Sequence, residues 1–414
     1  MKNKWILPIL IGIIGLVITL SYVFNNNYTA ISDSESEYAI YKEITETGSW
    51  KPIGDNVLSS CLMTTLLPAL IQRVVRANPL VVFNLYVSIV IAFLPIVIFL
   101  IAKQFLRPHY ACLASVFVMS QPYFLWSPSF ARINVALIFF GLLVLVLLRK
   151  SLETRYRVSA IVVCTVGIVI SHYGTAFAGL FILGLTWVFT TLRGVHGRET
   201  MTIALVSLIV AMFVWYSLVT ITPATYGSYV IRDTATEIRD AVTKTEIRDA
   251  VTKTEVRDAV TKVENENSEE QSFWSIESRG PVIQAAFGKR LSVMNIPQKI
   301  EFVFSWLTVI VMSYGLFLML RKKGELAHPN FQALSVVCYS MICLTVLSPY
   351  LSNVYGISRT YYTALIPLST CFIIGGIDVA ERIKVPPFIL ISGLLVSFML
   401  CTTGIMHQMF GLVR

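Results

Sequence analysis

The sequence predicts an all-helical bundle that crosses a membrane about eleven times. Of its 414 residues, 55% are hydrophobic and only 14% are charged, whereas soluble chains carry about 25% charged residues. Long apolar runs alternate with short polar segments. Runs of about 20 apolar residues suit spanning helices, whereas the strands of a membrane barrel would show weak alternation over about ten residues.

Charge and cysteine usage argue against two other classes. The net charge is +9, but the Lys and Arg residues are dispersed in short loops between apolar runs. That pattern is typical of membrane orientation signals, so we expect membrane lipids and no nucleic acid as partners. The seven cysteines mostly lie within apolar runs and form no CxxC pair, so neither a disulfide framework nor a zinc site is expected.

The first span follows a basic start. Its apolar run, 5–24, is longer than the hydrophobic core of a typical signal peptide, so we expect it to stay in the membrane. Together with ten later spans, it forms two membrane modules, 1–221 and 301–414, on either side of an outer segment, 222–300. The later spans are expected at 80–102, 110–122, 131–148, 158–171, 174–192, 200–221, 301–320, 331–350, 361–378 and 385–402.

The apolar segment 58–77 decides the orientation. If it does not cross, the basic loops gather on the side of Lys2 and Lys4, as the positive-inside rule requires. We therefore expect it to lie on or dip into the outer interface as a helix. The protein is then a multi-pass protein of the cell membrane with a cytoplasmic N-terminus. The expected extracytoplasmic loops are 25–79, 222–300 and 351–360.

The long outer loop 222–300 contains a nine-residue repeat over 236–262: two copies of TEIRDAVTK and a third with Val256 in place of isoleucine. Nine residues make about 2.5 helical turns, so the apolar position of successive copies alternates between opposite helix faces. No continuous apolar stripe results, and each copy is charge-neutral. We expect a solvated helical spacer or a disordered insertion; an arm that binds a partner is the alternative.

Carboxylates gather directly behind the first span, and three of them are candidate site residues. On a helix, Asp33 and Glu37 would share a face at a spacing of four, while Glu35 would point away. Two carboxylates so placed can share a divalent cation such as Mg²⁺ or Mn²⁺, or one can act as a base beside the other. The alternative is an acidic loop with no site.

Four more polar residues are expected at the same membrane face: Arg132 at the mouth of a span, His172 and Tyr173 where two apolar runs meet, and Arg359 at the start of a late span. Arginine suits the phosphate of a lipid-linked donor, and histidine can bind a ligand or transfer a proton. Each also has a structural alternative: interfacial anchoring for the arginines and a hydrogen-bonded helix junction for the histidine.

Three short motifs carry a family resemblance. They are SDSESEY at 32–38 with GSW at 48–50, SHYG at 171–174, and RTYY at 359–362. With an acidic loop after the first span and a late outer arginine, the chain resembles the GT-C superfamily of membrane glycosyltransferases. These enzymes use sugars linked to polyprenyl phosphates such as dolichol phosphate. More narrowly, it is similar to an archaeal multi-pass family of predicted glycosyltransferases, which implies a role in cell-surface glycosylation.

The resemblance implies roles for individual residues. Asp33 matches the catalytic aspartate, which serves as base or helps to hold a metal; Glu37 matches the acidic residue one turn later; and Arg359 matches the phosphate-contacting arginine. Arg132 and His172 fall at positions typical of the family whose roles are not established there. Our own hypothesis adds that Arg132 assists Arg359 at the phosphate and that His172, Tyr173 and Glu35 support the site. The acceptor would be a glycan, a lipid or a protein.

One departure from the family concerns its second acidic motif. Many relatives carry it in a later outer loop, but the corresponding segment here, 121–126, has no carboxylate. A metal at Asp33 and Glu37 is therefore in question, and a degenerate, non-catalytic member is an alternative.

Other functions compete with the glycosyltransferase. A polysaccharide polymerase or ligase also acts on lipid-linked sugars, and a flippase would transport them. A flippase should show inverted repeats and ionisable residues near the middle of the membrane. A scaffold that displays the repeat arm is a third possibility. The sequence favours the glycosyltransferase because its acidic loop directly follows the first span.

Overall fold

The computed structural model describes residues 5–26, 30, 32–52, 57–149, 151–194, 198–220, 281–289, 291–321, 328–348, 351–352 and 356–409. The repeats at 236–262, and most of the loop that contains them, lie outside these residues. The chain divides into two compact units. The first comprises Met1–Ala224, Asn295–Tyr339 and Tyr362–Arg414, and the second comprises Thr225–Met294 and Ser340–Tyr361.

The described residues form helices joined by turns and loops, with no strand among them. Nine helices in this part of the chain are long and apolar enough to cross a membrane. The prediction of a multi-pass helical membrane protein is confirmed at this level. The spans are α1 (Ile6–Asn25), α4 with α5 (Pro79–Ile91, Phe93–Ala102), η2 with α8 (Ser127–Phe130, Ala131–Leu148), α9 (Thr154–Ser171), α10 (Tyr173–Leu192), α11 with η3 (Arg198–Met212, Phe213–Val219), α14 (Ile296–Arg321), α15 (Pro329–Leu347) and α17 (Ile357–Arg382).

Two of the eleven expected spans form shorter helices. The segment 110–122 forms α6 (Pro108–Met119), and 385–402 forms α18 (Pro387–Thr402). At a rise of 1.5 Å per residue these helices are about 18 and 24 Å long, less than the ~30 Å hydrocarbon core of a bilayer. Short helices also form at α7 (Pro122–Leu125), α13 (Pro281–Ala286) and α19 (Ile405–Met409).

The segment between α1 and α4 contains three further helices: α2 (Asp33–Thr47), η1 (Val57–Ser60) and α3 (Leu66–Val75). The apolar helix α3 has ten residues, a length of about 15 Å, so it is too short to span. It packs against α2 and α4 while Leu70, Val74 and Val75 stay exposed. This geometry fits the predicted interfacial helix.

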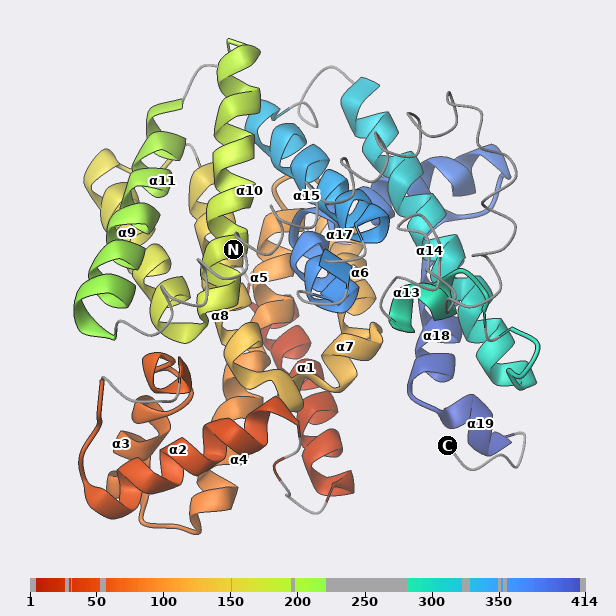
Figure 1. The fold of residues 1–414 in the computed structure, drawn as a ribbon. Helices are drawn as coiled ribbons and strands as arrows, with labels where there is room; N and C mark the ends of the chain where they lie inside the picture. The colour runs from red at the N-terminus through yellow and green to blue at the C-terminus, as the bar shows by residue number, and fades with distance from the viewer. Residues whose placement is uncertain are drawn as a thin grey trace, which may run out of the picture. The chain divides into compact units, whose positions relative to one another are not determined.

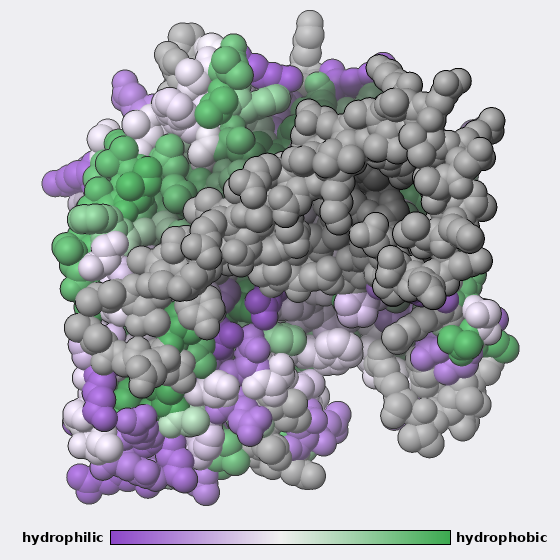
Figure 2. All heavy atoms as spheres, in the orientation of Figure 1, coloured by the Kyte–Doolittle hydropathy of each residue, from purple (hydrophilic) through white to green (hydrophobic). Residues whose placement is uncertain are grey.

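Helix α8 forms the core of the first unit. Most of its side chains are buried, and it packs against α4, α5, α9 and α10 (Figure 1). The helices around it are apolar on the outside: α9 exposes Val162 and Val163, and α11 exposes Val206 and Val210. Figure 2 shows this hydrophobic surface at the left of the view, above the hydrophilic residues that gather over α2 and α3. An outer surface of this kind suits contact with lipid.

Two glycines allow α14 and α17 to cross with their backbones in contact. A Cβ atom at Gly315 would overlap the carbonyl oxygen of Cys371, and a Cβ atom at Gly375 would overlap that of Val311. Small residues serve this purpose in membrane bundles because they let the helices approach closely. By contrast, a Cβ atom at Gly393 in α18 would meet no atom within 4 Å.

We expect Gly315→Ala to lower the thermal unfolding temperature of the detergent-solubilised protein by several degrees, because α14 and α17 must separate. The matched control is Gly393→Ala, which should leave the temperature unchanged or raise it slightly, since alanine favours a helix by about 1 kcal/mol over glycine. Equal effects of the two substitutions would contradict the close crossing.

Candidate functional site

Helix α2 buries one face against an end of the membrane bundle. Its buried residues are Ser34, Glu37, Ile40, Tyr41 and Ile44, a spacing that places them along one helical stripe. Glu35 is exposed on the other side. As the helical periodicity predicts, Asp33 and Glu37 share one face of α2 and Glu35 points away from it. The periodicity did not indicate that the carboxylate of Glu37 would be buried among the apolar residues of that face.

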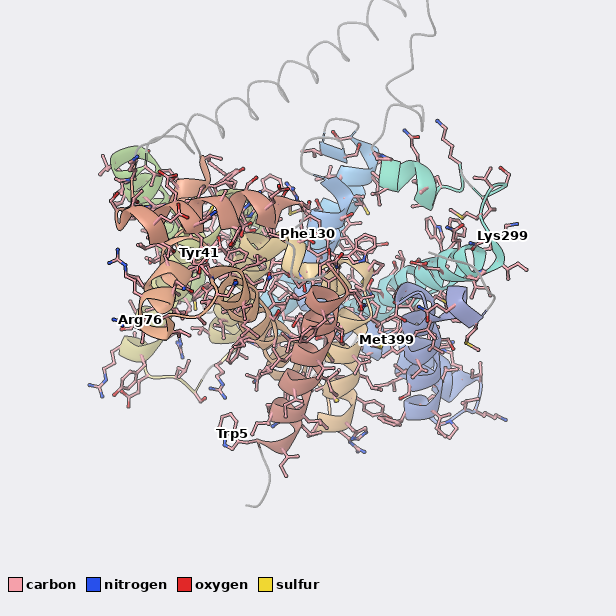
Figure 3. The ribbon with its side chains drawn as sticks, turned by 90° about the horizontal axis from the view of Figure 1, so that it is seen from below. Trp5, Tyr41, Arg76, Phe130, Lys299 and Met399 are labelled. Atoms are coloured by element: carbon pink, nitrogen blue, oxygen red, sulfur yellow. The ribbon has the colours of Figure 1, made fainter. Side chains whose placement is uncertain are left out.

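Tyr41 fixes α2 to its neighbours. Its hydroxyl lies 3.1 Å from the side-chain oxygen of Gln72 in α3 and 3.0 Å from the carbonyl oxygen of Pro79 at the start of α4. The Tyr41 ring also packs with those of Tyr38 and Phe83, with all three ring centroids 5.4 to 5.6 Å apart. Figure 3 shows Tyr41 and Phe130 on the side of the helices opposite Trp5. Helix α2 is thus held where several spans begin or end.

An acid–arginine cluster, composed of Asp33, Glu37 and Arg132, joins α2 to the first turn of α8. The Nη2 atom of Arg132 donates to Oδ2 of Asp33 at 2.8 Å, and Nη1 donates to Oε1 of Glu37 at 3.2 Å. The side chains of Arg132 and Glu37 are 8% and 0% exposed, whereas that of Asp33 is 26% exposed. Asp33 is therefore the member of the cluster that a substrate can reach.

The ionisation of Glu37 reflects its burial. Burial raises the pKa of Glu37 from its ordinary value of 4.5 to about 7, and the charge and hydrogen bond of Arg132 oppose this rise. The nearby Thr64 hydroxyl also lowers the pKa of Glu37. The same hydroxyl can donate its proton to the Cys61 carbonyl oxygen instead, at 3.4 Å. Asp33 raises the pKa through like-charge repulsion. Near neutral pH, Glu37 can therefore bind or release a proton.

The cluster leaves hydrogen-bonding capacity unused. Among the described residues, Oε2 of Glu37 and Nε of Arg132 are buried without a hydrogen-bond partner. The same holds for Oγ of Ser127 in η2, five residues before Arg132, and for Oδ1 of Asn134, two residues after it. Unsatisfied buried polar atoms are costly and usually hold water or serve a site. These atoms make the start of α8 a polar region at the end of an apolar bundle.

The short helix η1 ties this region to Trp50, which follows α2, and to η3. The indole nitrogens of Trp50 and Trp215 donate to the carbonyl oxygens of Ser59 and Ser60, respectively. The two indole rings stack, with an interplanar angle of 3°. Trp215 lies in η3 at the end of α11, so this contact anchors η1 to the bundle. The next residue, Cys61, is buried beside the cluster, and burial raises the pKa of its thiol to about 12.

The His172–Tyr173 junction lies close to the cluster. The backbone amide of Tyr173 hydrogen-bonds to Cys61, and the Tyr173 side chain interacts electrostatically with Arg132. His172 caps α10: its Nδ1 atom accepts a hydrogen bond from the Thr175 amide at 3.0 Å and lies 2.8 Å from the Thr175 hydroxyl. This geometry matches the structural alternative for His172, a hydrogen-bonded helix junction.

The structure thus brings together Asp33, Glu37 and Arg132, with Tyr173 nearby. Arg359 lies in the first turn of α17, within the second unit, and its role as a phosphate ligand stays a prediction. Sequence reasoning gave Arg132 a phosphate contact and missed its two carboxylate partners. The signal was available, because an arginine inside an apolar span requires a partner. Thr64 and Cys61 carried no such signal.

Fold and site together define a multi-pass helical membrane protein with a buried acid–arginine cluster at one end of its bundle. No protein-family model matches the chain, and no curated protein is significantly similar to it. The contacts of the cluster therefore carry the functional argument, together with the motifs at 32–38, 171–174 and 359–362.

The raised pKa of Glu37 should make the stability of the folded protein depend on pH. The folded protein keeps the proton of Glu37 up to a pH of about 7, whereas the unfolded chain loses it near 4.5. Between these values the folded state binds more protons, so this residue's contribution to stability falls as the pH rises. We expect Glu37→Gln to lose less thermal stability than the wild type between about pH 5 and pH 7.5. Parallel melting curves for the two proteins across this range would contradict the raised pKa.

Proposed function

We propose that the protein transfers a sugar from a polyprenyl-phosphate donor to a hydroxyl-bearing acceptor on a glycan, a lipid or a protein at the extracytoplasmic membrane face. The observation that carries this proposal is the acid–arginine cluster. It offers one accessible carboxylate, Asp33, held by a buried arginine where the spans of an apolar bundle begin and end. A lipid-linked sugar would present its phosphate and anomeric carbon at that depth of the membrane.

Asp33 is the proposed base. It would accept the proton of the acceptor hydroxyl as the acceptor oxygen forms a bond to the anomeric carbon. The bond between that carbon and the phosphate oxygen breaks, and the lipid phosphate leaves with the electron pair. Attack opposite the leaving group inverts the anomeric configuration. Glu37 cannot serve as the base in this way because its carboxylate is fully buried.

The departing phosphate requires positive charge. Arg359 is the proposed ligand, by its resemblance to the late arginine of the glycosyltransferase family. Arg132 is less suited than the sequence indicated, because two nitrogens of its guanidinium already donate to Asp33 and Glu37.

The position of the cluster favours a transferase over a flippase. Transporters place their ionisable residues near the middle of the membrane, where the substrate is passed across. Arg132 instead lies in the first turn of α8, and its partners belong to α2, which is not one of the membrane spans. The exposed apolar residues of the neighbouring α3 also support a site at the membrane surface.

Asp33→Asn tests this function. Removal of a catalytic base lowers the rate by roughly 10² to 10⁴, so the substitution should give the host the same altered surface-glycan masses as deletion of the gene. Glu46→Gln, at an exposed position on the same helix, also removes one negative charge and should leave the masses unchanged. The measurement is mass spectrometry of surface glycoproteins and glycolipids. Normal masses with Asp33→Asn, in a host where gene deletion alters them, would refute the proposal.

A further inference from the structure

We propose that Arg132 is a built-in cation that takes the place of a divalent metal between Asp33 and Glu37. Its catalytic significance rests on the proposed function, in which Asp33 is the base. It assigns Arg132 as a positioning residue: the guanidinium neutralises part of the charge of the acidic pair and holds Asp33 in place. The structural part of the inference concerns only the three side chains.

The carboxylates of the cluster are poorly placed for a metal. Mg²⁺ and Mn²⁺ prefer octahedral oxygen coordination, and Mg²⁺ is typically held by one or two carboxylates together with waters and substrate phosphates, which need room beside both carboxylates. The Glu37 side chain, however, is fully buried. Among the described residues, no group of three His, Cys, Asp or Glu side chains is placed to hold a metal ion. Asp33 and Glu37 are the acidic members of the cluster, and one oxygen of each already accepts a hydrogen bond from Arg132.

Electrostatics disfavour a metal at the same place. The guanidinium lies 2.8 Å from an oxygen of Asp33 and 3.2 Å from an oxygen of Glu37, so a dication bound by both carboxylates would lie within a few ångströms of it. The Arg132 side chain is only 8% exposed, so solvent cannot screen this repulsion well. The arginine and a divalent metal would therefore exclude each other as the cation that neutralises the carboxylates of Asp33 and Glu37.

The shape of the guanidinium suits this task. Its planar fork presents separate nitrogens to separate acceptors, and here Nη2 serves Asp33 while Nη1 serves Glu37. A lysine ammonium carries the same charge as a compact point and lacks this fork. Arg132 starts from the first turn of a buried helix, so its direction is set by α8 rather than by the loop. The cluster is thereby assembled when α2 packs on α8.

Chemical rescue tests this inference. Arg132→Ala should lower the thermal unfolding temperature of the full-length protein in detergent, because Glu37 then lies buried beside Asp33 without a cation. Millimolar guanidinium chloride or methylguanidinium chloride should restore several degrees relative to sodium chloride at the same ionic strength. Mg²⁺ and Mn²⁺ should not. Arg132→Lys should melt between the wild type and Arg132→Ala, since it keeps the charge and loses the fork.

A second experiment uses the wild-type protein and can be carried out even if Arg132→Ala does not fold. Its unfolding temperature should stay the same with EDTA, with Mg²⁺ and with Mn²⁺. Stabilisation of the wild type by Mg²⁺ or Mn²⁺ that disappears in the Asp33→Asn/Glu37→Gln variant would overturn the inference. Rescue of Arg132→Ala by a divalent metal, or its failure to respond to guanidinium above the sodium chloride control, would do the same.

Unfolding temperatures do not depend on sugar transfer, so the two proposals fail separately. If glycan masses stay normal with Asp33→Asn while guanidinium rescues Arg132→Ala, the glycosyltransferase proposal is refuted and the role of Arg132 as the cation of the cluster is supported. If the masses change with Asp33→Asn but a divalent metal stabilises the wild type through Asp33 and Glu37, the role of Arg132 is refuted and the glycosyltransferase proposal is supported.

Discussion

The burial of Glu37 is the constraint on which the site depends. A carboxyl group on the apolar face of α2 must either keep its proton or meet a cation inside the protein, and Arg132 is the cation that favours its ionised form. Removing one partner of a buried ion pair typically costs about 3 to 5 kcal/mol. The contact between Nη1 of Arg132 and Oε1 of Glu37 therefore shapes the cluster and, together with the contacts of Tyr41, attaches α2 to the bundle.

This contact also explains the division of roles between the two acids. Asp33 and Glu37 are four positions apart on one face of α2, so the same guanidinium reaches both. Asp33 lies at the start of α2 and stays partly exposed, while Glu37 lies one turn further into the protein. The inner carboxylate orients the arginine, the arginine orients the outer carboxylate, and the outer carboxylate remains accessible to a substrate.

Much of the fold could be predicted from the sequence, because apolar length alone identifies spanning helices. Nine of the expected spans appear as long apolar helices, and 58–77 contains a helix too short to cross. The shared face of Asp33 and Glu37 followed from helical periodicity. The pairing with Arg132 did not, because residues 95 and 99 positions apart in sequence meet only through tertiary packing. The capping role of His172 depended likewise on a local backbone turn.

The most direct test of the Glu37–Arg132 pair is a double-mutant cycle, with Arg132→Met, Glu37→Leu and the double variant compared by thermal unfolding in detergent. If Arg132 compensates the buried charge of Glu37, the double variant will be more stable than Arg132→Met alone, with a coupling energy of at least about 1 kcal/mol. Additive effects, with the double variant destabilised by the sum of the two single substitutions, would contradict the account.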